Sequence, residues 1–257
     1  MKVLILDIET APNLAYVWRF FKENVSPKQV VENSTLLSYC AKWLGEDQVF
    51  YDDCREDLDE LGLVLGLAAL LDEADVIVAH NGVRFDVPKI NTACLRNGVV
   101  PPSPFKQVDT FQVAKKKFKF DSNKLEHIAD HLELPMKKLA HKKFPGFELW
   151  LECLRGNNEA WEEMKEYNIN DVLVLEQLYL RLRPWVDNHP NAGVILEEDV
   201  PVCPKCGSKH LQKRGYSYTT TGKYQRFRCN DCGGWGRSRF TEYPKDKRKA
   251  LIVNAVN

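Results

Sequence analysis

The chain opens with an unbroken apolar run, Val3 to Leu6, followed at once by Asp7-Ile8-Glu9. A short run without polar residues is typical of a strand that is buried on both faces. Successive side chains of a strand point to opposite faces, so Asp7 and Glu9, two residues apart, share one face. We therefore expect a strand inside a layered α/β domain, with two carboxylates at its end.

The rest of the first 183 residues alternates between strand and helix patterns. LLSYCAKW and QVFYDD, separated by LGED, predict a hairpin, and DVIVAH predicts a further buried strand. Helical patterns cover 56–74, 86–97, 109–118, 122–133 (with Ser122 as N-cap) and 158–183. Early strands followed by alternating helices and strands predict a mixed sheet with helices packed on its faces.

The charges are sorted along the chain. Residues 200–257 carry 13 Lys and Arg against 3 Asp and Glu, whereas the first 199 residues carry 23 against 33. Such a split predicts two modules with different partners, and the basic one is expected to bind phosphate. A change of composition near 184–200 places the boundary. We expect a first domain over 1–187, a linker over 188–200, a small module over 201–243 and a basic tail over 244–257.

No apolar stretch approaches the roughly 20 residues that a membrane-spanning helix needs. The N-terminal apolar run is also shorter than the 7–15 residues or so of a signal-peptide core. We therefore expect a cytoplasmic protein without a membrane partner.

Further polar residues follow other predicted elements. Asp86 comes after the buried strand DVIVAH, and Tyr167 and Asp171 are four residues apart on a predicted helix, so they share one face. If these groups meet Asp7 and Glu9, four carboxylates converge, which only bound metal ions or protonation makes tolerable. Hard oxygen ligands of this kind favour Mg²⁺ or Mn²⁺.

Three motifs carry a family resemblance: D-I-E at 7–9, H-N-G-x-x-F-D at 80–86 and Y-x-x-x-D at 167–171. Together they resemble the DEDD-type 3′–5′ exonucleases, which include proofreading domains of DNA polymerases. The resemblance covers about residues 1–183 and implies an RNase H-like fold. It also implies that Asp7, Glu9, Asp86 and Asp171 bind the catalytic metal ions. Tyr167 would mark the tyrosine branch, because the histidine branch needs His where this chain has Glu166.

The chemistry expected of such a site is phosphodiester hydrolysis. Two divalent ions about 4 Å apart would flank the scissile phosphate, activate a water and stabilise the departing 3′-oxygen. Tyr167, with a reference pKa near 10, is expected to orient the attacking water rather than to deprotonate it. The products would be nucleoside 5′-monophosphates.

Residues beside these motifs have weaker predictions. Thr10 and Asn81 are expected to contact the terminal nucleotide. Phe85 is expected to pack in the core, and packing beneath that nucleotide is the alternative. The lysine-rich runs Lys115–Phe120 and Lys137–Lys143 fit a phosphate-backbone contact and a solvated helix edge equally well.

Eight cysteines divide into two groups. Cys40, Cys54, Cys94 and Cys153 stand alone in apolar or helical segments, as inert buried thiols do. Two C-x-x-C pairs, 22 residues apart, resemble the two knuckles of a zinc ribbon, with one structural Zn²⁺ bound by four thiolates: Cys203, Cys206, Cys229 and Cys232.

Basic residues alternate with aromatic ones between the two cysteine pairs. This pattern is typical of a surface that contacts a phosphate backbone and stacks on bases, although the aromatic residues could instead form the ribbon's own core. The residues expected to contact nucleic acid are Lys213, Arg214, Lys223, Arg226 and Arg228.

The sequence thus predicts a metal-dependent 3′–5′ exonuclease with a C-terminal zinc ribbon that binds nucleic acid. Single-stranded DNA is the favoured substrate, RNA is the alternative, and replication or repair proteins are candidate partners. Two other functions stay open: a nucleic-acid-binding adaptor with an inactive nuclease fold, and a structure-selective endonuclease. The oligomeric state is not predicted.

Overall fold

The structure is a computed structural model that describes residues 1–136, 143–253 and 255. Apart from Lys143, the lysine-rich run at 137–143 lies outside the described residues. The chain divides into two units, residues 2–179 and residues 180–257 together with Met1, and each is described by itself. The domain boundaries expected from composition stay a prediction.

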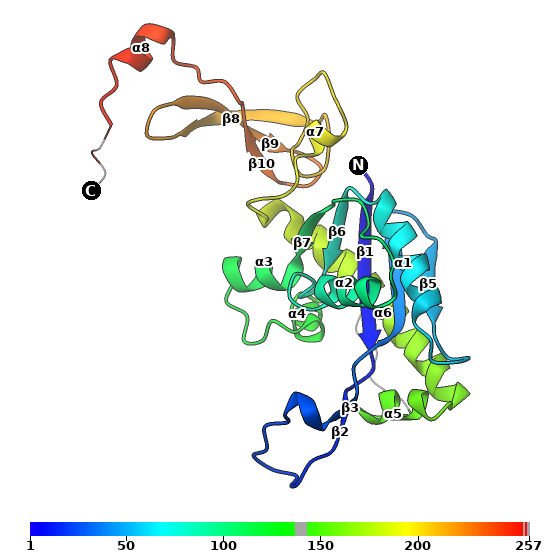
Figure 1. Cartoon of the computed structure of the whole chain (residues 1–257). Coiled ribbons are helices and arrows are strands. Elements are labelled where there is room, and N and C mark those ends of the chain that lie inside the picture. Colours follow the sequence, from blue (N-terminus) through cyan, green and yellow to red (C-terminus); the bar gives the residue numbers. More distant parts are fainter. Residues whose placement is uncertain (137–142, 254, 256–257) are drawn as a thin grey trace. The chain divides into compact units, whose positions relative to one another are not determined.

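A five-stranded mixed sheet forms the centre of the first unit (Figure 1). β1 lies in the middle, antiparallel to β4 and parallel to β6, while β4 pairs antiparallel with β5 and β6 pairs parallel with β7. The sheet order is β5-β4-β1-β6-β7. The strands are β1 (Val3–Thr10), β4 (Leu36–Trp43), β5 (Val49–Asp53), β6 (Val76–Ala79) and β7 (Lys106–Asp109). This arrangement confirms the predicted mixed α/β sheet.

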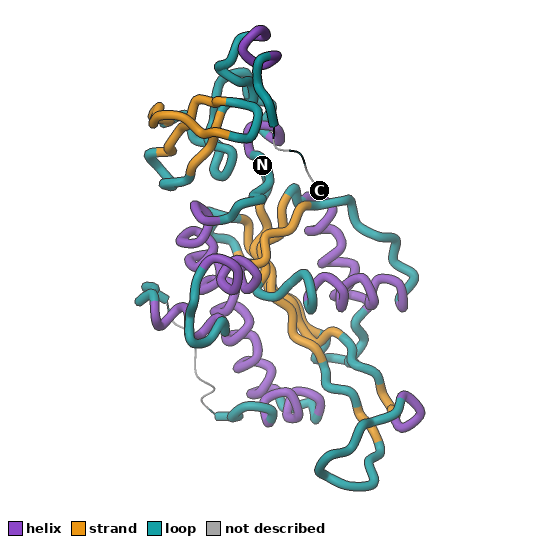
Figure 2. Tube along the Cα trace, turned by 90° about the vertical axis from the view of Figure 1, so that its left-hand side faces the viewer, coloured by secondary structure: helices purple, strands orange, loops and turns teal. Residues whose placement is uncertain are grey.

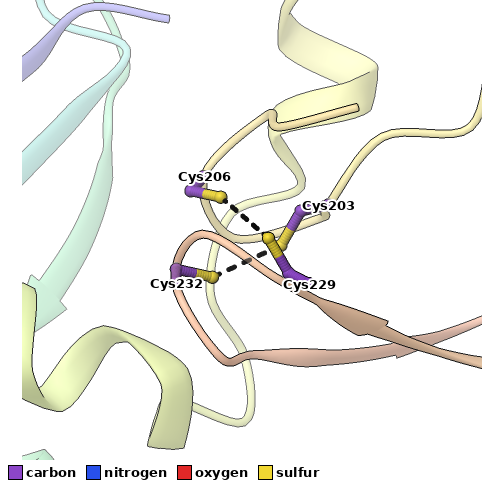
Figure 3. A group of neighbouring side chains, drawn as sticks. All are labelled: Cys203, Cys206, Cys229 and Cys232. Atoms are coloured by element: carbon purple, nitrogen blue, oxygen red, sulfur yellow. Dashed lines mark hydrogen bonds between the residues drawn. The ribbon is translucent and has the colours of Figure 1, made fainter. Parts of the chain in front are cut away.

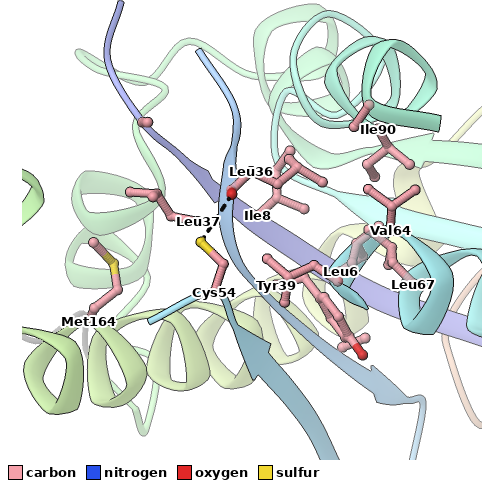
Figure 4. Close-up of a cluster of buried hydrophobic side chains, with 14 of the residues drawn as sticks. Leu6, Ile8, Leu36, Leu37, Tyr39, Cys54, Val64, Leu67, Ile90 and Met164 are labelled. Atoms are coloured by element: carbon pink, nitrogen blue, oxygen red, sulfur yellow. Dashed lines mark hydrogen bonds between the residues drawn. The ribbon is translucent and has the colours of Figure 1, made fainter. Parts of the chain in front are cut away.

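The two faces of β1 have different environments. Leu6 and Ile8 point into the hydrophobic core beneath α1 (Leu61–Glu73) and α2 (Asp86–Arg96), as Figure 4 shows. Asp7, between them, points to the opposite face, where α6 (Asn158–Leu182) lies. Helices therefore lie against both faces of the sheet (Figure 2). The predicted alternation places the carboxylates of β1 toward α6.

The helix α6 is fixed to the sheet by charged groups as well as by packing. Lys42 of β4 donates to Glu176 at 2.7 Å, and the second oxygen of Glu176 accepts the amide of Gly45 at 2.8 Å. Arg55 contacts both Asp53 and Glu162. These links set the position of α6 along the sheet, and with it the side chains that α6 presents to β1.

An arm formed by residues 11–35 leaves the end of β1 and returns to the start of β4 (Figures 1 and 2). It contains the short ribbon β2 (Leu14–Ala15) and β3 (Val30–Glu32), which pair antiparallel, and the 3-10 helix η1 (Pro27–Gln29).

The boundaries of several elements differ from the sequence-based expectations. α1 begins at Leu61 rather than at 56, because Asp57 and Asp59 accept local backbone amides in turns that compete with the helix. Ser122 is not the N-cap of α4: its hydroxyl accepts from Lys124 in a tight turn, and the helix begins at Leu125. The sequence analysis missed β7 and α5. The remaining helices of this unit are α3 (Thr110–Lys117), α4 (Leu125–His131) and α5 (Glu148–Leu154).

The second unit contains a three-stranded antiparallel sheet in the order β10-β9-β8. Its elements are η2 (Arg183–Trp185), α7 (Ala192–Ile195), β8 (Leu211–Tyr218), β9 (Lys223–Cys229), β10 (Trp235–Arg237) and α8 (Lys245–Lys249). Among the helices of the described residues, none has both the length and the apolarity to cross a membrane.

The Lys42–Glu176 pair gives a stability prediction. The two side chains are only 7% and 14% exposed, so Lys42→Ala leaves a carboxylate largely out of water without its cation. We expect the free energy of unfolding to fall by roughly 3 kcal/mol. Urea unfolding followed by tryptophan fluorescence measures it. The matched control is Lys2→Ala, whose partner Glu73 and whose own side chain are more than half exposed, and which should change little. If both substitutions lowered the free energy of unfolding by the same amount, the Lys42–Glu176 pair would not have the stabilising role that its burial predicts.

Candidate active-site cleft and thiol cluster

A cleft of about 750 Å³ lies in the first unit, at the end of β1. Its lining includes all five side chains that the sequence analysis selected as catalytic: Asp7, Glu9, Asp86, Tyr167 and Asp171. Asn81 lines the same cleft, whereas Thr10 is not among the lining residues. Residues from β1, from α6 and from the segment that follows β6 thus meet in one cavity.

The carboxylates of β1 are held by donors from elements that are distant in sequence. The amide of Asn168, next to Tyr167 on α6, donates to Asp7 at 2.7 Å, and the Ser38 hydroxyl donates to Asn168 at 3.1 Å. The indole of Trp150 on α5 donates to Glu9 at 3.2 Å. Asn168 is fully buried, so its orientation is set by these contacts rather than by solvent.

The turn between β6 and α2 places Asp86. Asn81 has a left-handed backbone, with φ of 72°, which asparagine tolerates better than most residues. The carboxylate of Asp109, at the end of β7, accepts the amides of Asn81 at 3.0 Å and Val83 at 3.3 Å. The turn then enters α2, whose first residue is Asp86.

Asp86 is a buried acid of the cleft with a perturbed pKa. It is 2% exposed, and burial raises its pKa to about 7, with a further contribution from the charge of Asp109. Hydrogen bonds from its own amide and from the amide of Ile8, at 3.3 Å, oppose this rise. Because Ile8 lies between Asp7 and Glu9, this bond ties Asp86 directly to the carboxylates of β1.

The helix α6 supplies the remaining groups. Tyr167 and Asp171 are one turn apart and both line the cleft, as their spacing predicts. The ring of Tyr167 meets that of Trp150 edge to face, with centroids 6.1 Å apart. Trp150 therefore contacts both Glu9 and Tyr167.

Two expectations about neighbouring residues have different outcomes. Phe85 does not pack in the core: its side chain is 39% exposed and lines the cleft, because the turn at 80–85 places it at the start of α2 and outside the sheet. Cys40 is buried, and burial together with the charges of Asp7 and Asp171 raises the pKa of its thiol, which keeps it protonated.

The donor set of the cleft fits hard divalent cations. Four carboxylates from three segments provide only oxygen ligands, as Mg²⁺ and Mn²⁺ prefer.

Sequence reasoning missed three residues that position the site: Asn168, Trp150 and Asp109. Asn168 lies inside the Y-x-x-x-D motif, and its position next to Tyr167 was a signal that could have been used. Nothing in the local pattern singles out Trp150, because its partner lies 141 positions away. Asp109 is recognisable as the N-cap of α3, but its contacts with Asn81 and Val83 span 28 and 26 positions.

The four cysteines of the second unit form a compact group (Figure 3). Their sulfur atoms all lie within 4.8 Å of one another, and the Cys203–Cys232 and Cys206–Cys229 pairs are 3.6 Å apart. Burial raises the pKa of the Cys229 thiol, but amide hydrogen bonds from Cys232 and Asp231 outweigh it and bring the value to about 7. Four sulfur donors at this spacing could bind zinc.

The basic residues predicted between the cysteine pairs lie on both faces of the small sheet. Arg226 and Arg228 share one face of β9, while Lys223 points to the other. On the first face, Arg226 lies over the ring of Trp235 at 4.8 Å and Arg237 lies over Tyr224 at 3.9 Å. On the second, Lys223 lies 3.8 Å from the centre of the Tyr216 ring. Lys213 and Arg214 are exposed on β8.

Comparisons with known proteins identify the family of the first unit. The family model for the RNase H superfamily matches residues 4–183. Among solved structures, 136 chains match. One is the family B DNA polymerase from the hyperthermophilic archaeon Pyrobaculum calidifontis, with a TM-score of 0.48 and 17% identity. That match covers 71% of this chain and 25% of the polymerase, so the chain spans about a quarter of its length. No curated protein matches.

The raised pKa of Asp86 gives a prediction for the chain without added divalent cations. The pKa of Asp86 is higher in the folded state, about 7, than in the unfolded state, about 4. Between these pH values the folded state binds more protons than the unfolded state, so the free energy of unfolding falls as the pH rises. Asp86→Asn removes this cost and keeps an oxygen for the Ile8 amide. At pH 8 the variant should melt on the order of 10 °C above the parent chain, and at pH 4 the two should nearly coincide.

The exposed Asp52→Asn on β5 is the control and should show no such pH dependence. A difference between Asp86→Asn and the parent chain that is the same at both pH values would mean that the substitution acts through packing rather than through charge.

Proposed function

The chain belongs to the RNase H superfamily, and on that premise we propose that it is a metal-dependent 3′–5′ exonuclease of the DEDD type. Membership of this superfamily supports a nuclease that hydrolyses nucleic acid, and its nucleases generally use divalent metal ions. The observation that carries the finer proposal is the cleft itself, where four carboxylates and one tyrosine meet. The favoured substrate is single-stranded DNA, and the products are nucleoside 5′-monophosphates.

Asp7, Glu9, Asp86 and Asp171 would hold two Mg²⁺ or Mn²⁺ ions. When bound, such ions lower the pKa of a water and offset the charge that develops on the leaving oxygen. The positive charge of the ions also favours the ionised form of Asp86, against its burial.

The protein's own groups position the reaction. Asn168 holds one oxygen of Asp7, and Trp150 holds one oxygen of Glu9, so neither carboxylate has to be ordered when substrate binds. The Tyr167 ring packs against Trp150 and lines the cleft. There its hydroxyl can donate a hydrogen bond to the attacking water or accept one from it. Tyr167 thus orients the water and does not deprotonate it.

In this proposal the second unit binds one zinc ion through Cys203, Cys206, Cys229 and Cys232 and contacts nucleic acid through its basic residues. The excess of 13 basic over 3 acidic residues in 200–257 supports the second role, since the preceding part of the chain is acidic. The stacked pairs Arg226–Trp235 and Arg237–Tyr224 support contact with both phosphates and bases.

Substitutions in the cleft test the catalytic proposal. Asp7→Ala and Asp171→Ala should lower Mg²⁺-dependent release of nucleotides to below about 1% of the parent rate, because each removes a metal ligand. Tyr167→Phe keeps the ring and should lose on the order of 10–100-fold in kcat. The assay uses 5′-fluorescein-labelled single-stranded DNA, with mass spectrometry of the released products.

Asp52→Ala, on β5 and outside the cleft, is the matched control for the aspartate variants and should keep full activity. Substantial activity in both aspartate variants would contradict the metal-ligand assignment. Cutting of circular single strands would identify an endonuclease, and an inactive parent chain would favour the adaptor.

The basic residues of β9 give a separate prediction. Arg226→Gln with Arg228→Gln removes two cations from one face of β9. The slope of the logarithm of the binding constant against the logarithm of the salt concentration should therefore become shallower by roughly 1.4 for a single strand. KM for long strands should rise, while kcat on short saturating substrates should not change. Lys245→Gln with Lys247→Gln, which removes the same charge from α8, is the comparison. Equal slopes for the parent chain and the β9 variant would mean that this face binds protein instead.

A further inference from the structure

The arm at residues 11–35 exposes an unusual amount of aromatic surface. Trp18 is 94% exposed, Phe20 93%, Phe21 83% and Tyr16 77%. Single exposed apolar residues are common on soluble proteins, but a contiguous group of large ones marks a binding surface. No motif in the sequence predicts a role for this segment.

Polar contacts within the arm hold these rings outward. The carboxylate of Glu23 accepts the amides of Trp18, at 3.2 Å, and of Arg19, at 2.8 Å, and so closes the tip into a loop. Gln29 donates to Glu23 at 3.1 Å and to the carbonyl of Tyr16 at 2.9 Å. With the acid of the tip engaged in this way, the aromatic side chains alternate with two cations, Arg19 and Lys22.

The base of the arm adjoins a second, cationic cavity. A cavity of about 260 Å³ is lined by Ser34 and Thr35, where the arm returns to the sheet, and by Arg84, Lys89 and Arg96. Arg96 is partly neutralised by Glu60, whereas the ammonium group of Lys89 donates to the uncharged Ser34 hydroxyl, at 2.9 Å.

This cavity adjoins the catalytic cleft at one side chain. Phe85 lines both cavities. The arm also begins at Ala11, two residues after Glu9, and its two ends are joined by the hydrogen bond from the Ala11 amide to the Thr35 carbonyl. Cleft, Phe85, cationic cavity and arm base therefore follow one another within the first unit.

We propose that this succession is the track of the unpaired strand that leads to the scissile phosphate. With the 3′-terminal nucleotide in the cleft, the strand passes Phe85, places a phosphate against Arg84 and Lys89, and stacks bases on Trp18, Phe20 and Phe21. This proposal rests on the proposed nuclease function and names the residues that bind its substrate.

Charge favours nucleic acid over a protein as the occupant. The first 199 residues carry ten more acidic than basic groups, so most of this part of the chain repels polyanions. The cationic cavity and the tip with Arg19 and Lys22 depart from that pattern at the places where the exposed rings and Phe85 lie. Aromatic faces beside cations are what single-strand binding uses, because every base can stack and every nucleotide carries a phosphate.

The first experiment separates stacking from general apolarity. In an Asp171→Ala background, which is expected not to cut the strand, a 5′-fluorescein-labelled thymidine dodecamer is titrated by fluorescence anisotropy. The triple variant Trp18→Leu, Phe20→Leu and Phe21→Leu keeps apolar surface but removes the rings. It should bind at least about 30-fold more weakly. The triple variant Trp18→Phe, Phe20→Tyr and Phe21→Tyr keeps the rings and should stay within about threefold.

The second experiment tests the cationic cavity. Arg84→Gln with Lys89→Gln should reduce the salt slope of binding by roughly 1.4, since each lost contact removes about 0.7 for a single strand. Lys106→Gln with Lys165→Gln removes equal charge from exposed positions that do not line either cavity, and should leave the slope unchanged. Thermal melts check that each variant folds.

Two outcomes separate the track from the function on which it rests. Hydrolysis of thymidine 5′-(4-nitrophenyl phosphate) by the parent chain needs only the cleft, so its absence would count against the nuclease function while the binding series still tests the track. If the leucine triple variant binds the dodecamer as tightly as its background, the track is wrong and the arm is a protein-docking element. An unchanged salt slope in the Arg84→Gln, Lys89→Gln variant would contradict the phosphate contact at the cationic cavity.

Discussion

The structure of the first unit depends on gathering like charges at one end of β1. Asp7 and Glu9 share a face because strand side chains alternate, and Asp86 and Asp171 join them from two helices, so electrostatic repulsion opposes the arrangement. The protein offsets this cost with fixed donors: an amide from Asn168, an indole N–H from Trp150 and the backbone amide of Ile8. Asp86 carries a further cost, because burial raises its pKa to about 7, and a bound cation would favour its ionised form.

The fold and the cleft residues were largely accessible from local pattern. A four-residue apolar run predicts a buried strand, period two places Asp7 with Glu9, and a spacing of four places Tyr167 with Asp171. The same reasoning could not find Asn168 or Trp150 as partners, because they lie 161 and 141 positions from the carboxylates they hold. Such contacts are properties of the packed sheet and α6, not of any segment.

Local pattern also misjudged exposure. Phe85 follows a buried strand and was expected in the core, yet the turn held by Asp109 carries it into the cleft. The arm's WRFF sequence has the composition of a buried segment, but the Glu23 contacts keep its rings in solvent. In both cases a carboxylate, Asp109 or Glu23, accepts backbone amides and so fixes the turn that carries the apolar side chain. The spacing of apolar residues in the sequence does not predict such hydrogen bonds.

The central claim is that the four carboxylates bind the catalytic metal ions. Anomalous diffraction from crystals of the full chain grown with Mn²⁺ and thymidine 5′-monophosphate tests it directly. We expect two manganese peaks among Asp7, Glu9, Asp86 and Asp171, close to the nucleotide phosphate, and a zinc peak among the four cysteine sulfurs. A cleft that holds the nucleotide with no manganese peak among these carboxylates would contradict the account.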